Sequence, residues 1–290
     1  MRKEVIYLSE DRQIHLTAYL HEHSPQLPLW RTRPAVVVLP GGGYQMTSDR
    51  EADPVALSFL AQGFHAFVLR YSVADRVTYP NPLCDVSRAL QTIRHCAEDW
   101  GVRPQQIAVC GFSAGGHLAA SLGTLWNDPE IETAAGVSAG ENQPNALILC
   151  YPVISAFKHA RANWFTAQMN EQTREKIVEK LSCELHVGPH TPPTFLFHTY
   201  DDNTVPVENS LLFAQALAQA DIPFEMHLFQ YGTHGVSLAN ELSSHGGASA
   251  LDGSAERWFD LATTWLWRLF GKPVSSGEST TTQRAHFDLT

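Results

Sequence analysis

The stretch QIAVCGFSAGGHLAA, residues 106–120, constrains the fold more than any other part of the sequence. The apolar run from Ile107 to Cys110 is typical of a buried strand, and small residues typical of a packed helix follow the turn. Between them lies G-F-S-A-G, which predicts a sharp turn that strains the backbone of Ser113 and makes its hydroxyl stand clear of the sheet. Glycines two residues before and after the serine suit a turn whose ends approach closely. This strand–turn–helix context indicates a nucleophilic serine rather than a structural turn.

Strand and helix signals alternate on both sides of this turn. Apolar runs and apolar–polar alternation predict eight strands, at residues 4–8, 14–21, 35–39, 65–71, 107–110, 146–151, 194–198 and 224–229. Apolar residues at helical spacing predict further helices at residues 53–61, 83–100, 171–181, 207–220 and 255–270. The polar segment 127–143 is predicted to form a loop. The first two strands form a hairpin, and the alternation after them predicts an α/β protein with a mostly parallel sheet covered on both faces.

The length and the order of these elements predict one large domain over residues 1–272 of the 290-residue chain. Residues 155–193 interrupt the alternation as a small insertion after the sixth strand. This insertion either roofs the site and shapes substrate choice or packs on the surface, and the sequence leaves both open. The Ser/Thr-rich residues 273–290 are predicted to form a C-terminal tail.

The charge and the cysteine pattern restrict the partners and the compartment. A formal charge of −10 disfavours nucleic acid and anionic membranes, because both need a basic surface. The first residues lack the apolar core of a signal peptide, and no segment is long enough to span a bilayer. Five cysteines without C-x-x-C spacing indicate reduced thiols, so we expect a cytoplasmic protein.

A serine hydroxyl is a weak nucleophile at neutral pH and needs a base, normally a histidine that a carboxylate orients. His234 follows a predicted strand between glycines, so its ring is expected to reach the serine. His198 lies at a strand end and precedes the acid, and His117 lies on the helix after the turn, so both are poorer candidates. Asp201 and Asp202 are neighbours in one loop, and their chemistry alone does not choose between them.

A second glycine-rich segment, P-G-G-G-Y at residues 40–44, directly follows the strand predicted at 35–39. Three glycines allow backbone amides to turn toward an approaching ligand. A phosphate-binding loop is disfavoured because the segment has neither G-K-S/T nor G-x-G-x-x-G. With the serine turn present, a loop that stabilises a developing oxyanion is favoured over a flexible turn.

Four segments together resemble the α/β-hydrolase esterases, and most of all the bacterial acetyl-esterase and acetylxylan-esterase-like enzymes related to hormone-sensitive lipase. They are C-G-F-S-A-G-G-H, P-G-G-G-Y, H-x-x-x-D-x-x-V-P and G-x-H-G. The resemblance covers about residues 30–270 and implies the α/β-hydrolase fold. In such sequences the acid stands four residues after the histidine and four before the proline, which selects Asp202.

The same resemblance implies, by position, that the amides of Gly42, Gly43 and Ala114 form the oxyanion hole. Tyr44 is expected to share in the substrate pocket. Pro40 departs from the family, because it replaces the histidine of the usual H-G-G-G, so the loop is expected to be held differently.

The implied activity is that of a serine carboxylesterase acting on short acyl, above all acetyl, esters, and the resemblance suggests acetylated sugars. Ser113, His234 and Asp202 would work through an acyl-enzyme without a cofactor or metal. A small ester is the expected partner, and the sequence leaves a homo-oligomer open. The rivals are a peptidase or amidase with the same triad, and a non-catalytic ligand-binding relative. Such peptidases normally carry a large extra domain, and such binding proteins usually lose the base or the acid.

Overall fold

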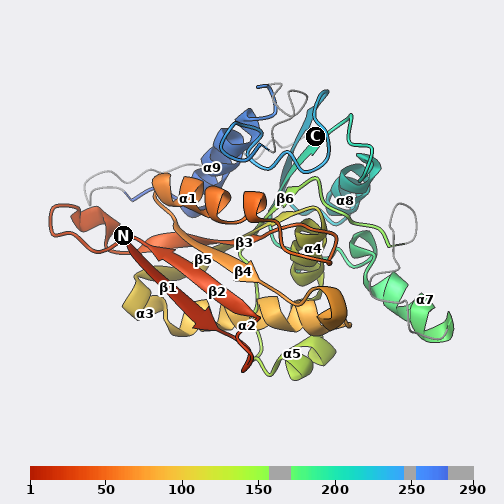
Figure 1. The fold of residues 1–290 in the computed structure, drawn as a ribbon, viewed down its shortest axis with the longest axis horizontal. Helices are drawn as coiled ribbons and strands as arrows, with labels where there is room; N and C mark the ends of the chain where they lie inside the picture. The colour runs from red at the N-terminus through yellow and green to blue at the C-terminus, as the bar shows by residue number, and fades with distance from the viewer. Residues whose placement is uncertain (157–170, 245–252, 274–290) are drawn as a thin grey trace, which may run out of the picture.

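The computed structural model describes residues 1–156, 171–244 and 253–273, and its centre is one eight-stranded sheet in the order β1-β2-β4-β3-β5-β6-β7-β8 (Figure 1). The strands are β1 (Arg2–Tyr7), β2 (His15–Leu20), β3 (Arg33–Leu39), β4 (His65–Arg70), β5 (Val102–Phe112), β6 (Ala146–Cys150), β7 (Thr194–Thr199) and β8 (Phe224–Phe229). β1 pairs antiparallel with β2, and β2 pairs antiparallel with β4. All other neighbours are parallel, so the predicted fold class is confirmed.

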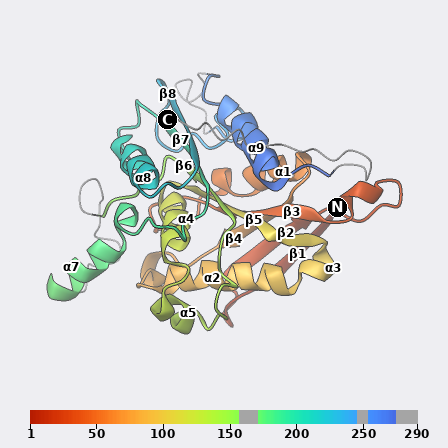
Figure 2. The same cartoon turned by 180° about the vertical axis from the view of Figure 1, so that it is seen from behind.

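Helices cover both faces of the sheet (Figures 1 and 2). One face packs against α1 (Asp53–Ala61) and α9 (Arg257–Phe270). The other packs against α2 (Asn81–His95), α4 (Ala114–Leu125) and α8 (Glu208–Gln219). β3 is buried on both sides, because Val37 belongs to one core and Val36 and Val38 belong to the other. A strand buried in this way reads as a continuous apolar run, which is the pattern that predicted it.

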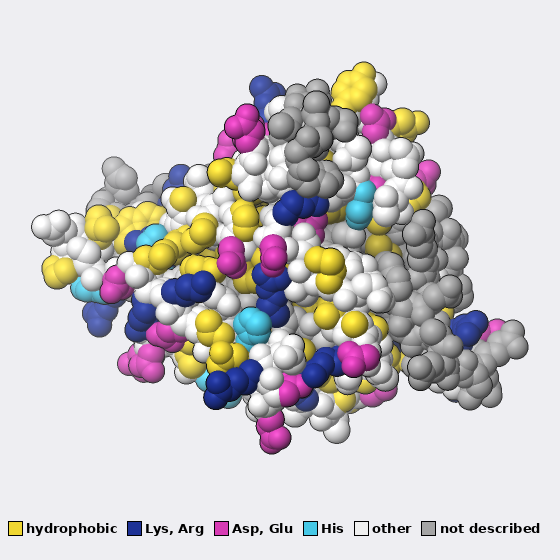
Figure 3. Space-filling view, viewed as in Figure 1, with side chains coloured by type: hydrophobic (Ala, Val, Ile, Leu, Met, Phe, Trp, Pro, Cys, Tyr) yellow, Lys and Arg dark blue, Asp and Glu magenta, His cyan; other side chains and the backbone are white. Residues whose placement is uncertain are grey.

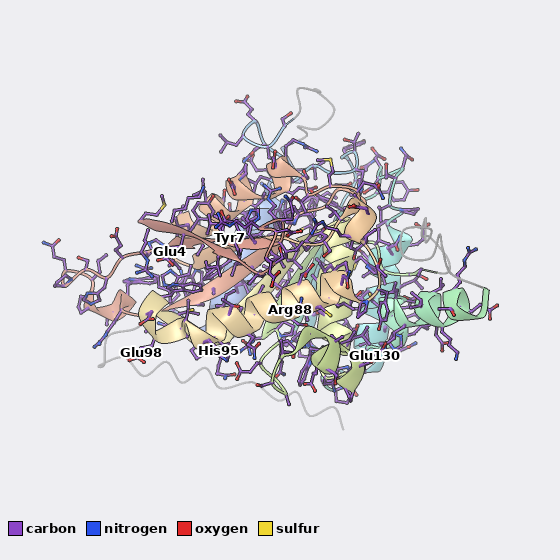
Figure 4. The ribbon with its side chains drawn as sticks, turned by 60° about the horizontal axis from the view of Figure 1, so that its bottom comes forward. Glu4, Tyr7, Arg88, His95, Glu98 and Glu130 are labelled. Carbon is purple, nitrogen blue, oxygen red and sulfur yellow. The ribbon has the colours of Figure 1, made fainter. Side chains whose placement is uncertain are left out.

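The helices on the α2 side carry charge on their outward surfaces. Figure 4 shows Arg88 and His95 along α2, Glu98 on the short α3 (Ala97–Trp100) and Glu130 on α5 (Pro129–Ala135). On the face shown in Figure 3, Lys and Arg side chains are interspersed with Asp and Glu. Within the described ranges, the structure holds no helix that combines the length and apolar character needed to cross a bilayer.

The prediction of a loop over residues 127–143 is wrong, because α5 lies within this segment. The Asp128 side chain accepts a hydrogen bond from the Glu130 amide at 2.8 Å, and Gly136 ends the helix with a φ of 66°. Only Ile131 and Ala135 of its seven residues are buried. A helix with so small an apolar face depends on its caps and escapes a search for apolar periodicity.

Two further helices differ from or refine the expectation. The helix predicted over residues 83–100 is divided at Cys96 into α2 and α3, and Gly101 ends α3 in the left-handed conformation. In the predicted insertion, α7 (Glu171–Lys180) lies at the periphery of the molecule in both ribbon views (Figures 1 and 2). Residues 157–170 of that insertion and most of the predicted tail lie outside the described residues.

The parallel register brings four chain segments to one edge of the sheet. Leu39 at the end of β3 pairs with Gly111 of β5, and β7 pairs with β8 through Thr199 and Phe229. Because these strands run in the same direction, the loops after them emerge together at their carboxyl ends. Those loops carry all the candidate residues from the sequence.

Candidate active site

The turn between β5 and α4 has the strained geometry that its sequence predicts. Ser113 has a φ of 53° and a ψ of −116°, which L residues rarely adopt. A Cβ on Gly111 would lie 2.2 Å from the Gly115 carbonyl oxygen, and one on Gly115 would lie 2.1 Å from that of Leu39. Neither position can therefore hold a larger residue without moving the backbone, which explains both glycines of the motif.

Ser113, His234 and Asp202 form one hydrogen-bonded chain. Ser113 Oγ lies 2.8 Å from His234 Nε2, and His234 Nδ1 lies 2.7 Å from Asp202 Oδ2. An ionised carboxylate only accepts hydrogen bonds, so Nδ1 carries the proton and donates a hydrogen bond to Asp202. Nε2 is then free to accept the serine hydroxyl proton. This tautomer is the one that a general base toward Ser113 requires.

The carboxylate of Asp202 is buried and fully supported. Its Oδ1 accepts hydrogen bonds from the amides of Thr204 and Val205, each at 2.9 Å. Burial by itself raises the pKa of Asp202, but hydrogen bonds from His198, His234 and the Val205 amide outweigh it and hold the pKa well below its usual range. Asp202 therefore stays ionised beside the imidazole at neutral pH. Asp201, the alternative acid, is exposed.

His198, the competing histidine, lies behind Asp202 rather than beside the serine. Its Nε2 lies 2.9 Å from the Val205 carbonyl oxygen and 3.5 Å from Asp202 Oδ2. Its Nδ1 lies 2.7 Å from Ser210 Oγ. The ring is fully buried in these contacts, so it helps to fix the acid and does not reach the nucleophile.

The glycine loop is held by its first peptide. The Gly41 amide donates to Glu51 Oε2 at 2.8 Å, and the Pro40 carbonyl accepts from the Tyr71 hydroxyl at 2.6 Å. These two contacts fix the loop, in which Pro40 replaces the histidine that is usual in the family. Gly42 and Gly43 follow with φ values of 130° and 60°. Among the described residues, no hydrogen-bond acceptor pairs with their amides.

A cavity of about 530 Å³ opens at this site, a volume typical of small-ligand pockets. Ser113, His234, Gly42 and Gly43 line it together with Glu51. Further side chains at the cavity are Gln45, Met46, Ser48, Arg50, Val153, Thr204 and Val205. Ala114 begins α4 directly after the serine, so its amide belongs to the helix N-terminus.

Tyr44 requires a correction, because the structure places its side chain in the core and not in this cavity. Its ring is buried at 1% exposure, and its hydroxyl lies 2.9 Å from His117 Nδ1. His117 Nε2 in turn lies 2.8 Å from the Leu181 carbonyl oxygen. Tyr44 therefore links the glycine loop to α4 through a contact in the core. Sequence position next to the glycines could not reveal on which side of the loop the ring lies.

The sequence missed two buried side chains that join the loops of the site, Glu51 and Tyr151. Glu51 lies in a 3₁₀ turn at Asp49–Glu51, in a polar stretch just before α1. Tyr151 ends the sixth strand region with a φ of 38°, and its ring lies 5.3 Å from that of His234. No motif marked either residue, and only their tertiary contacts reveal them.

Comparison with known proteins extends these observations. The profile of the BD-FAE family matches residues 27–217 of the chain. Acetylxylan esterase from Xylanibacter ruminicola is 29% identical over 252 residues, which are 84% of this chain and 48% of that protein. The chain spans about a third to just over half of the length of the curated relatives that align with most of it.

Solved structures align over nearly the whole chain. The carboxylesterase Cest-2923 from Lactobacillus plantarum has a TM-score of 0.83 at 30% identity, covering 95% of this chain and 100% of that one. The acetyl ester-xyloside bifunctional hydrolase from Caldicellulosiruptor lactoaceticus has a TM-score of 0.76 at 33% identity, covering 94% of this chain and 97% of that one.

Proposed function

The chain belongs to the BD-FAE family, an α/β-hydrolase esterase group, and from this premise we propose that it is a serine carboxylesterase for short-chain acyl esters. The observation that carries the proposal is the chain of hydrogen bonds from Ser113 through His234 to Asp202, at 2.8 and 2.7 Å. It stands at the wall of a cavity that fits a small ligand.

In the proposed mechanism, His234 Nε2 takes the proton of Ser113 Oγ as this oxygen attacks the ester carbonyl carbon. Asp202 holds the ring tautomer and stabilises the imidazolium that forms. The carbonyl oxygen becomes an oxyanion, which the amides of Gly42, Gly43 and Ala114 would stabilise, because backbone amides in a glycine-rich loop and at a helix N-terminus favour negative charge.

Collapse of the tetrahedral intermediate breaks the bond between the carbonyl carbon and the alcohol oxygen. The imidazolium gives its proton to the departing alcohol, and the acyl group stays on Ser113 Oγ. Water then attacks the acyl-enzyme with His234 again as base, and the second collapse releases the carboxylic acid and restores the serine.

We propose acetylated sugars as the substrate class within this activity. Polar side chains at the cavity, among them Gln45, Ser48 and Thr204, are suited to hydroxyl groups of a sugar alcohol. The relatives named acetylxylan esterase and acetyl ester-xyloside hydrolase support the same class. We further propose that residues 1–272 act as a single catalytic domain.

The test is a hydrolysis screen with p-nitrophenyl esters of increasing acyl length and with acetylated xylose, each measured for the parent and for Ser113→Ala. We expect the parent to hydrolyse the acetate faster than longer esters. Removal of the nucleophile should lower the rate by about 10⁶-fold, to a level set by the remaining site. Equal turnover by the alanine variant would refute the mechanism, and faster cleavage of p-nitroacetanilide than of the acetate would favour an amidase.

A further inference from the structure

Glu51 is a buried carboxylate whose two oxygens bind two different loops of the site. Glu51 is only 3% exposed to solvent. Oε2 accepts a hydrogen bond from the Gly41 amide, and Oε1 accepts one from the Tyr151 hydroxyl, both at 2.8 Å. Burying a carboxylate is unfavourable unless it is well paired, so its presence here calls for a role.

On one side, Glu51 fixes the glycine loop. The peptide between Pro40 and Gly41 is held at both ends, by Tyr71 at its carbonyl and by Glu51 at its N–H. Because the orientation of this peptide plane is fixed, the orientations open to the next two peptide groups are restricted. Those peptides carry the amides that we propose for the oxyanion hole. A Cβ on Gly41 would lie 2.7 Å from Glu51 Oε2 and 2.9 Å from Ser113 Cβ, so the carboxylate and the nucleophile flank the same glycine.

On the other side, Glu51 and its neighbour Arg50 hold the loop that carries His234. The Tyr151 hydroxyl, which donates to Glu51, accepts from the Ser237 amide at 2.8 Å. Arg50 Nη1 donates to the Gly235 carbonyl at 3.0 Å, and Ser237 Oγ donates to the Arg50 carbonyl at 2.7 Å. The turn at Asp49–Glu51 thus contacts the residues on the C-terminal side of the base.

We propose that Glu51 is a positioning residue that couples the oxyanion loop to the general base, an inference that rests on the proposed esterase function. The carboxylate suits this role because both of its oxygens only accept. A glutamine in its place has one accepting oxygen and an NH₂ group. If its oxygen accepts from Gly41, its NH₂ faces Tyr151 and the tyrosine proton must turn away.

The role predicts a loss confined to the chemical step. Glu51→Gln should lower kcat for p-nitrophenyl acetate by ~10- to 100-fold, because small displacements of catalytic groups have effects of this size. KM should stay within about twofold, since both Glu51 oxygens already accept hydrogen bonds from the protein, one from Gly41 and one from Tyr151. Binding of phenylboronic acid, which forms a tetrahedral adduct on serine, should weaken by about the same factor as kcat, because the adduct depends on the same amides.

The control is Asp49→Asn, which removes an acid from the same turn. The Asp49 side chain is 90% exposed and pairs with Arg70, so its loss should leave kcat unchanged. Titration with diethyl p-nitrophenyl phosphate counts the folded sites in each sample, so that kcat is expressed per active serine. Tyr151→Phe is the second variant. It removes the hydroxyl between Glu51 and Ser237 and should also lower kcat per titrated site, by about tenfold.

Three outcomes separate the possibilities. A fall in kcat per site together with weaker boronate binding supports the positioning role. A lower unfolding temperature with kcat per site unchanged in Glu51→Gln and Tyr151→Phe overturns it, because the loss of a purely structural contact lowers stability without changing the rate of the chemical step. Retained hydrolysis by Ser113→Ala would instead overturn the esterase mechanism itself, whatever the Glu51 variants show.

Discussion

His117 allows a quantitative prediction about stability in acid. The imidazole is buried between Tyr44 and the Leu181 carbonyl, and its desolvation lowers the pKa of His117 from its ordinary 6.5 to about 4. An unfolded chain binds this proton near pH 6.5, whereas the folded protein resists it down to about pH 4. Since the unfolded state binds more protons in this window, the free energy of unfolding falls as the pH falls.

The magnitude follows from the two pKa values. Each pH unit between them removes about 1.4 kcal/mol of stability, so the window from 6.5 to about 4 is worth about 3 kcal/mol. Between pH 7 and pH 5 the part due to His117 is about 2 kcal/mol, and this range lies above the titration of ordinary carboxyl groups. His65 is buried as well, and its lowered pKa adds a loss of the same sign.

The assay is urea unfolding at pH 7 and pH 5 for the parent and for His117→Gln. The variant should be less stable at pH 7, because the glutamine disturbs the contacts with Tyr44 and Leu181. Its further loss between pH 7 and pH 5 should be smaller than that of the parent by about 2 kcal/mol. His95→Gln, which changes an exposed histidine on α2 (Figure 4), is the matched control. Equal pH dependence in the parent and in His117→Gln would refute this account of the buried imidazole.

Two further predictions concern the proposed triad and the glycine loop. Asp202→Asn should lower kcat by roughly 10⁴-fold, as the loss of the orienting carboxylate does in such triads, whereas Asp201→Asn, which changes an exposed residue, should alter kcat little. Steady-state kinetics on p-nitrophenyl acetate measure both effects. The reverse result would assign the catalytic acid to Asp201. Gly42→Ala should lower kcat by about 10²-fold or more, because the new Cβ would lie 2.2 Å from the Met46 carbonyl oxygen. Gly136→Ala, also at a positive φ but with nothing within 4 Å, should leave kcat unchanged, and similar kinetics for both glycine variants would contradict the steric explanation.

The sequence anticipated those parts of the molecule that depend on contacts between near neighbours in the chain. The strand, turn and helix around Ser113 were predictable because the turn itself needs glycine at positions 111 and 115. The central strands were predictable because a strand buried on both faces requires a continuous apolar run such as the one in β3. α5 was missed although its caps at Asp128 and Gly136 are also local, because the prediction relied on apolar periodicity and only Ile131 and Ala135 of this helix are buried.

The residues around the site also fall into two groups, those that a local sequence motif marks and those that only tertiary contacts reveal. Ser113, His234 and Asp202 could be proposed from the sequence because each follows a strand in a recognisable motif, and the structure places the three side chains within hydrogen-bonding distance. Glu51 and Tyr151 carry no local signal, because a polar residue in a turn and a tyrosine after a strand are ordinary in sequence. Their meaning comes from partners 10 and 100 residues away in the chain.

By itself, the sequence determined the order of the strands along the chain, the parallel sheet and the identity of the residues at the ends of its strands. Hydrophobic periodicity and backbone sterics are local properties, so they can be read from the chain directly. The tertiary structure alone decided that Tyr44 turns into the core and that Glu51 is buried between two loops. Such choices depend on which distant surfaces meet, and on the burial and pairing of polar groups that only this meeting creates.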